Sequence, residues 1–334
     1  MPDGFSLLLI VVIVLAVAFD YINGFHDTAN AIATSVSTRA LRPTHAILMS
    51  ATANFIGALS GTAVANTIAS GIATTPTGDE GQVVVAAALI GAITWNLITW
   101  RLGIPSSSSH ALIGGLIGAV IASLGPPALN GQGIFDKVLF PLVASPVLGV
   151  LIGFSLMVML LNVFRRAHPR VLNDRFRRLQ VISAAYMAFS HGSNDAQKTM
   201  GIITLALVAG GVLAEPTVPL WVILVAATAI SLGTAAGGWR IIKTMGQRVV
   251  KLDPVHGFAA ETTAATIIMG ASHFGMPVST THVISSAIIG VGSSDRFSAV
   301  RWGVAGNIIV AWVLTIPASG FVAWLAWEIL ARVL

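Results

Sequence analysis

The chain has 334 residues, of which 55% are hydrophobic and only 9% are charged, and its mean hydropathy is +0.85. A soluble globular domain of this length does not have such a composition. The absence of cysteine excludes disulfides, thiolate metal sites and cysteine nucleophiles. The sequence pI of about 10.2 does not indicate nucleic-acid binding, because the basic residues gather in short loops between apolar runs.

Long uncharged runs predict an all-α membrane protein that crosses the lipid bilayer many times. A span of the ~30 Å hydrocarbon core takes about 20 helical residues. The runs are continuous rather than alternating, which argues against a β-barrel. We expect about 10–12 transmembrane helices, including broken or re-entrant segments. In chain order, the expected segments are residues 5–38, 44–70, 83–101, 110–124, 137–164, 179–213, 219–238, 256–274, 283–294 and 302–330.

Charged loops predict the orientation in a cell membrane. The most basic stretch, residues 165–178, is expected in the cytoplasm, as are the basic loops 39–42 and 240–251. The acidic pair at residues 79–80 lies on the opposite side in this arrangement. The N-terminus lacks the positive start of a cleavable signal peptide, and Asp3 favours its placement outside.

Two motifs occur twice. The segment GFHDTAN (24–30) is echoed by GSNDAQK (192–198), and IPSSSSH (104–110) is echoed by MPVSTTH (276–282). The basic loops place the two copies in opposite orientations, so the sequence predicts two inverted-topology repeats. Paired interrupted segments at matching places in two halves are the best sequence pointer to a transport site.

The expected boundaries follow from these motifs. They are a first repeat at 1–125, a linking helix and basic loop at 126–178, a second repeat at 179–295, and a C-terminal helix at 296–334.

The first motif pair contains a carboxylate in each copy, Asp27 and Asp195. A charged side chain at membrane depth costs at least ~2.5–3.5 kcal/mol, so each is either functional or neutralised by a structural partner. A glycine three residues earlier suggests a helix break that exposes backbone groups at each aspartate. Asn30 and Lys198 follow one helical turn later and can face the same cavity.

The second motif pair places hydroxyls behind a proline and before an apolar helix. A hydroxyl in a membrane helix usually bonds the backbone one turn back. Clustered hydroxyls at a helix N-terminus form an anion site instead, and one terminus from each copy could clamp a tetrahedral oxyanion. His110 and His282 favour capping roles over ligation. The hydroxyl candidates are Ser107, Ser108, Ser109, Ser279, Thr280 and Thr281.

Charge balance at this pocket requires a co-bound cation. Glu261 lies within an apolar run and favours a cation or proton site over a satisfied structural group. Three carboxylates and Lys198 sum to −2, and a dianion makes −4, which cannot stay uncompensated at mid-membrane. The pocket therefore predicts symport, with the coupling cation or proton at Asp27, Asp195, Glu261 and Asn194, and with Na⁺ a candidate at the two aspartates.

The repeated motifs resemble the paired signatures of the inorganic phosphate transporter (PiT) family, in particular its bacterial low-affinity branch. The similarity extends over nearly the whole chain, through residues 44–68, 239–246 and 277–282. It implies a dimeric secondary transporter that takes up inorganic phosphate with Na⁺ or H⁺ and needs no cofactor. The phosphate-site residues implied are Asp27, Asn30, Ser107, Ser108, Ser109, Asp195, Ser279, Thr280 and Thr281.

Two positions depart from that family pattern. Many members carry asparagine at the position of Lys198 and glutamate at the position of Asn54. The Lys198 ammonium could occupy the place of a bound Na⁺, which would favour H⁺ coupling or a reduced Na⁺ requirement. Alternatively, Lys198 pairs with Asp195 or contacts phosphate directly, and we include it among the phosphate-binding candidates.

Rival functions stay open at this stage. A sulfate permease or a metal–phosphate/H⁺ symporter could use the same scaffold. A passive anion channel is disfavoured by the carboxylates at the breaks. An intramembrane hydrolase is disfavoured because no spacing orients a base toward a nucleophile, so the chain is not expected to be an enzyme.

Overall fold

The computed structural model describes residues 6–70 and 75–333, and all its described regular structure is helical. Asp3 and the first residue of the expected span 5–38 lie outside the described residues. The helices are α1 (Leu7–Ser37), α2 (Pro43–Ala58), α3 (Ala63–Ser70), α4 (Asp79–Leu102), α5 (Ser108–Leu124), α6 (Gly131–Ile134), α7 (Phe140–Val163), α8 (Pro169–Ala209), α9 (Leu220–Ala236), α10 (Trp239–Lys243), α11 (Pro254–His273), α12 (Thr280–Asp295) and α13 (Trp302–Leu330).

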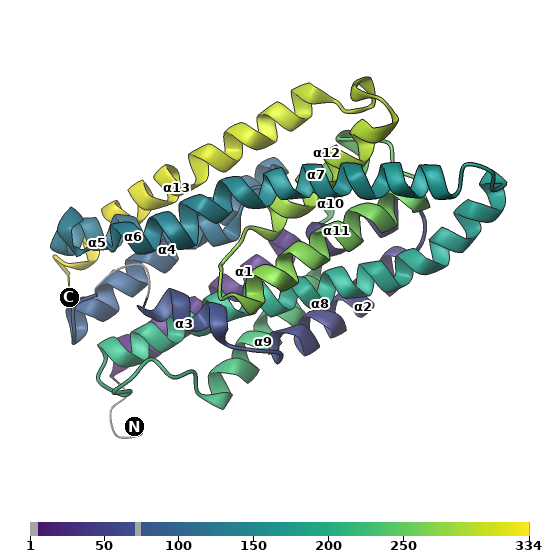
Figure 1. Ribbon diagram of the computed structural model, residues 1–334. Coiled ribbons are helices and arrows are strands. Elements are labelled where there is room, and N and C mark those ends of the chain that lie inside the picture. Colours follow the sequence, from purple (N-terminus) through teal and green to yellow (C-terminus); the bar gives the residue numbers. More distant parts are fainter. Residues whose placement is uncertain (1–5, 71–74, 334) are drawn as a thin grey trace.

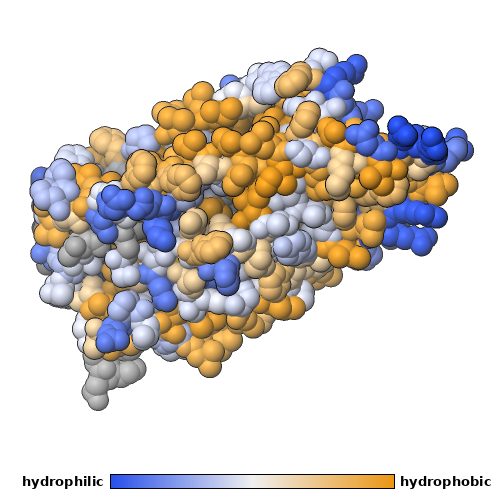
Figure 2. Space-filling model, in the orientation of Figure 1, coloured by the Kyte–Doolittle hydropathy of each residue, from blue (hydrophilic) through white to orange (hydrophobic). Residues whose placement is uncertain are grey.

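The expectation of an all-α membrane protein is confirmed. Within residues 6–70 and 75–333, four uninterrupted segments are long and apolar enough to cross a membrane: α1, α4, the run 131–163 that contains α7, and α13. The expected span 44–70 is bent by 68° between α2 and α3. A second bent pair consists of α9 and the helical residues 240–248. Figure 2 shows an extensive apolar surface, with hydrophilic residues gathered toward the ends of the molecule.

The expected breaks at the two aspartates are wrong. Both α1, with 31 residues, and α8, with 41 residues, run through their Gly-Asp motifs as continuous helices. The glycines serve close packing instead: a Cβ on Gly24 would lie 2.3 Å from the Ile230 carbonyl oxygen of α9. Likewise, a Cβ on Gly192 would lie 2.2 Å from the Asn54 carbonyl oxygen of α2. The missing side chains let two helix backbones approach closely.

The breaks expected at the proline motifs are present. Helix α4 ends at Gly103, which has a φ of 68°, and α11 is followed by Gly275, which has a φ of 65°. Left-handed backbone of this kind favours glycine. In each case a short turn leads to a serine N-cap, and the next helix, α5 or α12, begins one residue later.

Two apolar clusters surround a polar centre. The first half of α1, from Leu9 to Phe19, belongs to one cluster together with α4, α5 and the end of α8. The second half, from Ala29 to Ala33, belongs to the other cluster with α11, α12 and the start of α8. Helices α1 and α8 therefore pass through the polar centre in opposite directions, and Figure 1 shows them side by side within the bundle.

Candidate substrate site

The two predicted aspartates converge at the polar centre. Asp27 from α1 and Asp195 from α8 lie with His191 so that one ligand atom from each falls within 4.8 Å of the other two. The exposed fractions of the two aspartates are 2% and 0%. Sequence positions 168 residues apart are thus brought into one buried cluster by the crossing of α1 and α8.

Each carboxylate is held at the start of a short helix. The Ser108 hydroxyl, in the first turn of α5, donates to Asp27 Oδ2 at 2.6 Å. The Thr280 hydroxyl, in the first turn of α12, donates to Asp195 Oδ2 at 3.2 Å. Negative charge is favourable at a helix N-terminus because the unpaired N–H groups and the helix dipole attract it.

Asn30 joins the two motifs across the site. Its amide nitrogen donates to Thr280 Oγ1 at 3.2 Å and to Thr281 Oγ1 at 2.9 Å. One turn separates Asn30 from Asp27 on α1, so the same face of this helix reaches both short helices. The side-chain oxygen of Asn30, Oδ1, has no hydrogen-bond partner although it is buried.

Lys198 lies fully inside this cluster, with 1% of its surface exposed. Its ammonium donates to Asp195 and to the Ser109 hydroxyl, and to the Val278 carbonyl oxygen at 3.0 Å. The ammonium therefore lies among oxygens from α8, α5 and the turn before α12. This is the environment of a bound cation, and it also includes the ion pair with Asp195 that the sequence left as an alternative.

Two predicted hydroxyls are helix caps. Ser107 accepts from His110 N at 3.1 Å, and Ser279 accepts from His282 N at 3.2 Å. The two histidine rings are 4.7 Å apart and lie behind the caps, where His282 also stacks on Trp312. The histidine rings do not cap these helices, because His110 Nδ1 and both ring nitrogens of His282 have no hydrogen-bond partner. The capping role expected for the rings is therefore wrong, and the rings are packed instead.

Glu261 and Asn194 form hydrogen bonds with groups other than the paired aspartates. Glu261 on α11 accepts hydrogen bonds from Thr34, Ser183 and Gln180, which fully satisfy its carboxylate with neutral donors. The Asn194 amide donates to Ser272 Oγ at 2.9 Å and to the Met276 carbonyl at 3.2 Å, and so holds the turn before α12. Their role in coupling stays a prediction.

Sequence reasoning left His26 and His191 undecided. His26 Nδ1 lies 2.6 Å from Asp27 Oδ1, and its Nε2 lies 3.1 Å from Thr99 Oγ1 on α4. His191 Nδ1 lies 3.1 Å from Asn54 Oδ1, and its Nε2 lies 3.2 Å from Asp195 Oδ2. Each aspartate thus has its own histidine partner. The adjacency of His26 and Asp27 and the i, i+4 spacing of His191 and Asp195 were the available signals.

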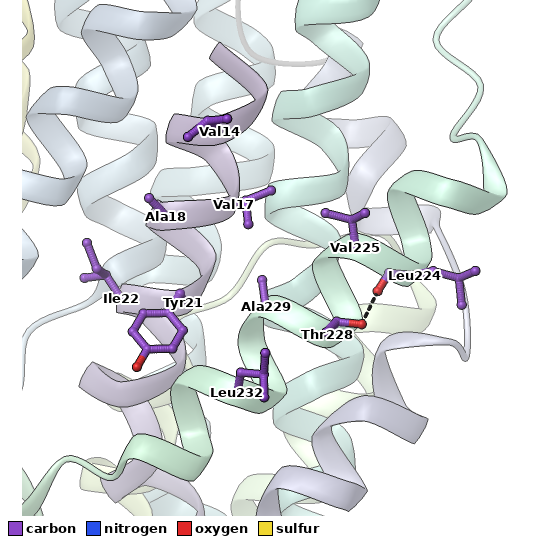
Figure 3. Close-up of a pocket in the computed structure, with 10 residues that line it drawn as sticks. All are labelled: Val14, Val17, Ala18, Tyr21, Ile22, Leu224, Val225, Thr228, Ala229 and Leu232. Carbon is purple, nitrogen blue, oxygen red and sulfur yellow. Dashed lines mark hydrogen bonds between the residues drawn. The ribbon is translucent and has the colours of Figure 1, made fainter. Parts of the chain in front are cut away.

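The pocket drawn in Figure 3 is a different feature. It has a volume of about 630 Å³ and lies between α1 and α9. Its walls are apolar apart from Tyr21 and Thr228, and the Thr228 hydroxyl donates to the Leu224 carbonyl. A surface of this kind suits lipid chains, and it offers no charged group to an anion.

These features define the class of protein: a helical membrane transport protein with a polar centre closed off by apolar helices. A family profile described as "Phosphate transporter family" matches residues 23–323. The chain belongs to this phosphate transporter family, which is a family of transporters and not a class of enzymes.

Two relatives match this chain over nearly the whole length of both sequences. A protein of Bacillus subtilis (strain 168) named "Probable low-affinity inorganic phosphate transporter" is 50% identical over 329 residues, which cover 98% of each chain. A protein of Rhizobium meliloti (strain 1021) with the same name is 49% identical over 96% of each chain. A solved structure titled "The sodium-dependent phosphate transporter" has a TM-score of 0.92 at 26% identity and covers 98% of this chain and 100% of its own.

Proposed function

We propose that this protein is a secondary active symporter that imports inorganic phosphate together with H⁺ or Na⁺. The observation that carries the proposal is the meeting of two hydroxyl-bearing helix N-termini, α5 and α12, at a pair of buried carboxylates. Phosphate would be held by the free N–H groups and hydroxyls of both termini. Its residues would be Asp27, Asn30, Ser107, Ser108, Ser109, Asp195, Lys198, Ser279, Thr280 and Thr281.

Phosphate fits such a site better than sulfate does. At neutral pH phosphate still carries a proton and can donate a hydrogen bond to a carboxylate, whereas sulfate is acceptor-only and is repelled. Asp27 directly contacts the neutral Ser108 hydroxyl and His26, with His191 and Asp195 also nearby, and its carboxylate can accept that bond. Electrostatics then requires a cation, because two negative charges moving against 100 mV cost about 4.6 kcal/mol.

We infer that two inverted repeats give alternating access to the site. The helix contacts exchange in pairs: α1 packs on α9 while α8 packs on α2, and α13 packs on α5 while α7 packs on α12. The close approaches repeat as well. Gly233 meets the Tyr21 carbonyl, and Gly57 meets the carbonyl of Phe189, which is 168 positions after Tyr21. We assign the repeats to 1–125 and 179–295, and a homodimer in the plasma membrane with its N-terminus outside is the expected assembly.

A metal–phosphate complex is the second candidate substrate. Asp27, His191 and Asp195 each offer one ligand atom within 4.8 Å of the other two. Carboxylate and imidazole together suit a divalent transition metal. A neutral metal–phosphate complex would also relieve the charge problem of importing a dianion.

Uptake by purified protein in proteoliposomes tests the proposal. Labelled phosphate, labelled sulfate and phosphate with an equimolar divalent metal are offered under separately imposed Na⁺ and pH gradients. We expect phosphate accumulation driven by a cation gradient, with sulfate at least tenfold slower. Sulfate uptake equal to phosphate uptake, or equilibration without any cation gradient, would refute phosphate symport. Metal-dependent accumulation would favour the second candidate.

A further inference from the structure

A second group of buried polar side chains lies on α1 before the phosphate site. Asp20 is 0% exposed, and neither of its carboxylate oxygens has a hydrogen-bond partner. Asn23, one turn later, is 1% exposed, and both of its amide atoms are unpartnered. The adjoining Tyr21 lines the surface pocket of Figure 3, whereas Asp20 is buried, so the two side chains lie on different faces of α1.

Neighbouring helices add oxygens to this group. The Thr199 hydroxyl of α8 and the Asn23 amide are near enough to the Asp20 carboxylate to interact with it, but neither forms a hydrogen bond of good geometry with it. Helices α1 and α4 run parallel, because Ser6 bonds Gln82 and His26 bonds Thr99. That register brings Asn96 of α4, another buried and unpartnered amide, to the level of Asn23.

An uncompensated carboxylate with two empty oxygens is unfavourable inside a membrane protein. The nearest charges are those of Asp195 and Lys198, which are already paired with each other. Asp20 therefore requires a positive partner that the chain itself does not supply. A proton would neutralise Asp20, whereas a bound cation would engage the Asp20 carboxylate together with the amide oxygen of Asn23 and the hydroxyl oxygen of Thr199.

We propose that Asp20, Asn23 and Thr199 form a binding site for a small alkali cation, for which Na⁺ is the probe. Carboxylate, amide carbonyl and hydroxyl oxygens are the ligands that hard cations prefer. One carboxylate balances one positive charge, and the nearby Lys198 ammonium disfavours a divalent ion. The site is two helical turns, about 10 Å, from Asp27 along α1.

This cation is a partner of the phosphate site, because Thr199 adjoins Lys198, which holds Asp195. Filling the site lowers the cost of a dianion two turns away. That coupling rests on the proposed function, whereas the binding of Na⁺ does not depend on it.

Equilibrium binding of ²²Na⁺ to the purified full-length protein, in phosphate-free buffer with choline as the balancing cation, tests the site. The variants are Asp20→Asn, Thr199→Val, Asp27→Asn and the double variant Asp20→Asn/Asp27→Asn, with the exposed Asp79→Asn as control. We expect Asp27→Asn to retain a Na⁺ site that the double variant loses. Asp20→Asn should weaken Na⁺ binding at that site at least tenfold, and Thr199→Val at least threefold.

Equal Na⁺ binding by Asp27→Asn and the double variant would overturn the proposal, as would wild-type protein that binds no Na⁺. Thr199→Val keeps the shape of the side chain, so it tests the site even if the Asp20 variants do not fold. Labelled-phosphate uptake by the wild-type protein reports separately on the proposed function. Wild-type protein that binds Na⁺ but takes up no phosphate would refute symport and leave the cation site standing.

Discussion

The two aspartates at the centre occupy chemically unequal environments. Asp27 directly contacts His26 and the neutral hydroxyl of Ser108. Asp195 instead pairs directly with the Lys198 ammonium, in addition to Thr280. A charge-assisted pair strongly favours the ionised carboxylate, so Asp195 has a built-in cation and Asp27 does not. The symmetry of the motifs therefore does not extend to the charge at the two positions.

Replacing Lys198 tests its role as a tethered cation. Lys198→Asn leaves Asp195 buried without a positive partner, so a free Na⁺ is needed to replace the ammonium. We expect phosphate uptake by proteoliposomes to require at least threefold more Na⁺ for half-maximal rate. The exposed Lys251→Asn serves as the control. Uptake that falls by the same factor at every Na⁺ concentration would assign Lys198 to direct phosphate contact or simple ion pairing.

At the scale of elements, two close helix crossings position the site. Gly24 lets α1 approach α9, and Gly192 lets α8 approach α2. Each glycine is three residues before its aspartate, so the same crossing that brings the backbones together also fixes the depth of the carboxylate. The aspartate motifs are thus carried by continuous helices, and the backbone at the hydroxyl motifs is irregular in the turns before α5 and α12.

Gly24→Ala tests the first crossing. The added Cβ would lie 2.3 Å from the Ile230 carbonyl oxygen, which is a backbone atom and can move only with α9. Overpacking of this kind costs about 1–3 kcal/mol. We expect a lower thermal unfolding temperature and reduced uptake. Gly306→Ala in α13, where nothing lies within 4 Å, is the matched control and should be neutral; equal behaviour of the two variants would contradict the packing role.

The N-cap of α11 gives a second test at this scale. Asp253 precedes the helix and accepts from the N–H groups of Val255 and His256 at 2.9 and 3.0 Å. Burial acts to raise the pKa of Asp253, but hydrogen bonds and attraction from His256 outweigh it and lower the pKa below its usual value of 3.8. A lowered pKa means that this carboxylate stabilises the fold above that pH and loses its contribution as the pH falls through the folded value.

Asp253→Ala should therefore lower stability by about 1 kcal/mol at pH 7, as expected for a lost N-cap. The difference from wild type should shrink as the pH falls below about 3.8. Thermal unfolding in detergent at both pH values measures it. A difference that is independent of pH would show that the charge of Asp253 does not contribute.

At the scale of the whole molecule, helices in corresponding places of the two halves have corresponding packing partners. Helix α7 covers α12, and α13 covers α5 in the corresponding place. The basic connection between α7 and α8 extends from one end of the bundle in Figure 1 and coincides with a hydrophilic area in Figure 2. By the positive-inside rule, we expect this end of the molecule to face the cytoplasm.

The natural absence of cysteine makes the orientation directly measurable. Single variants Glu80→Cys and Arg170→Cys place a thiol at one exposed position within the first repeat and at another in the connection between the two repeats. In intact cells a membrane-impermeant thiol reagent should label Glu80→Cys and spare Arg170→Cys until the cells are permeabilised. Labelling in the reverse pattern would invert the proposed topology and place the N-terminus inside.

The sequence by itself determined the membrane class, the helical segments, the paired motifs and the polar residues that meet at the centre, because apolar length, uncompensated charge and proline leave signals in the residue order. Only the tertiary structure decided that α1 and α8 are unbroken, that Lys198 reaches Ser109, that Glu261 and Asn194 bond groups other than the aspartates, and that Asp20 has no hydrogen-bond partner. These properties depend on which helices touch. A glycine has the same letter whether it breaks a helix or packs against another, and a buried carboxylate is satisfied or not according to neighbours that are distant in the chain.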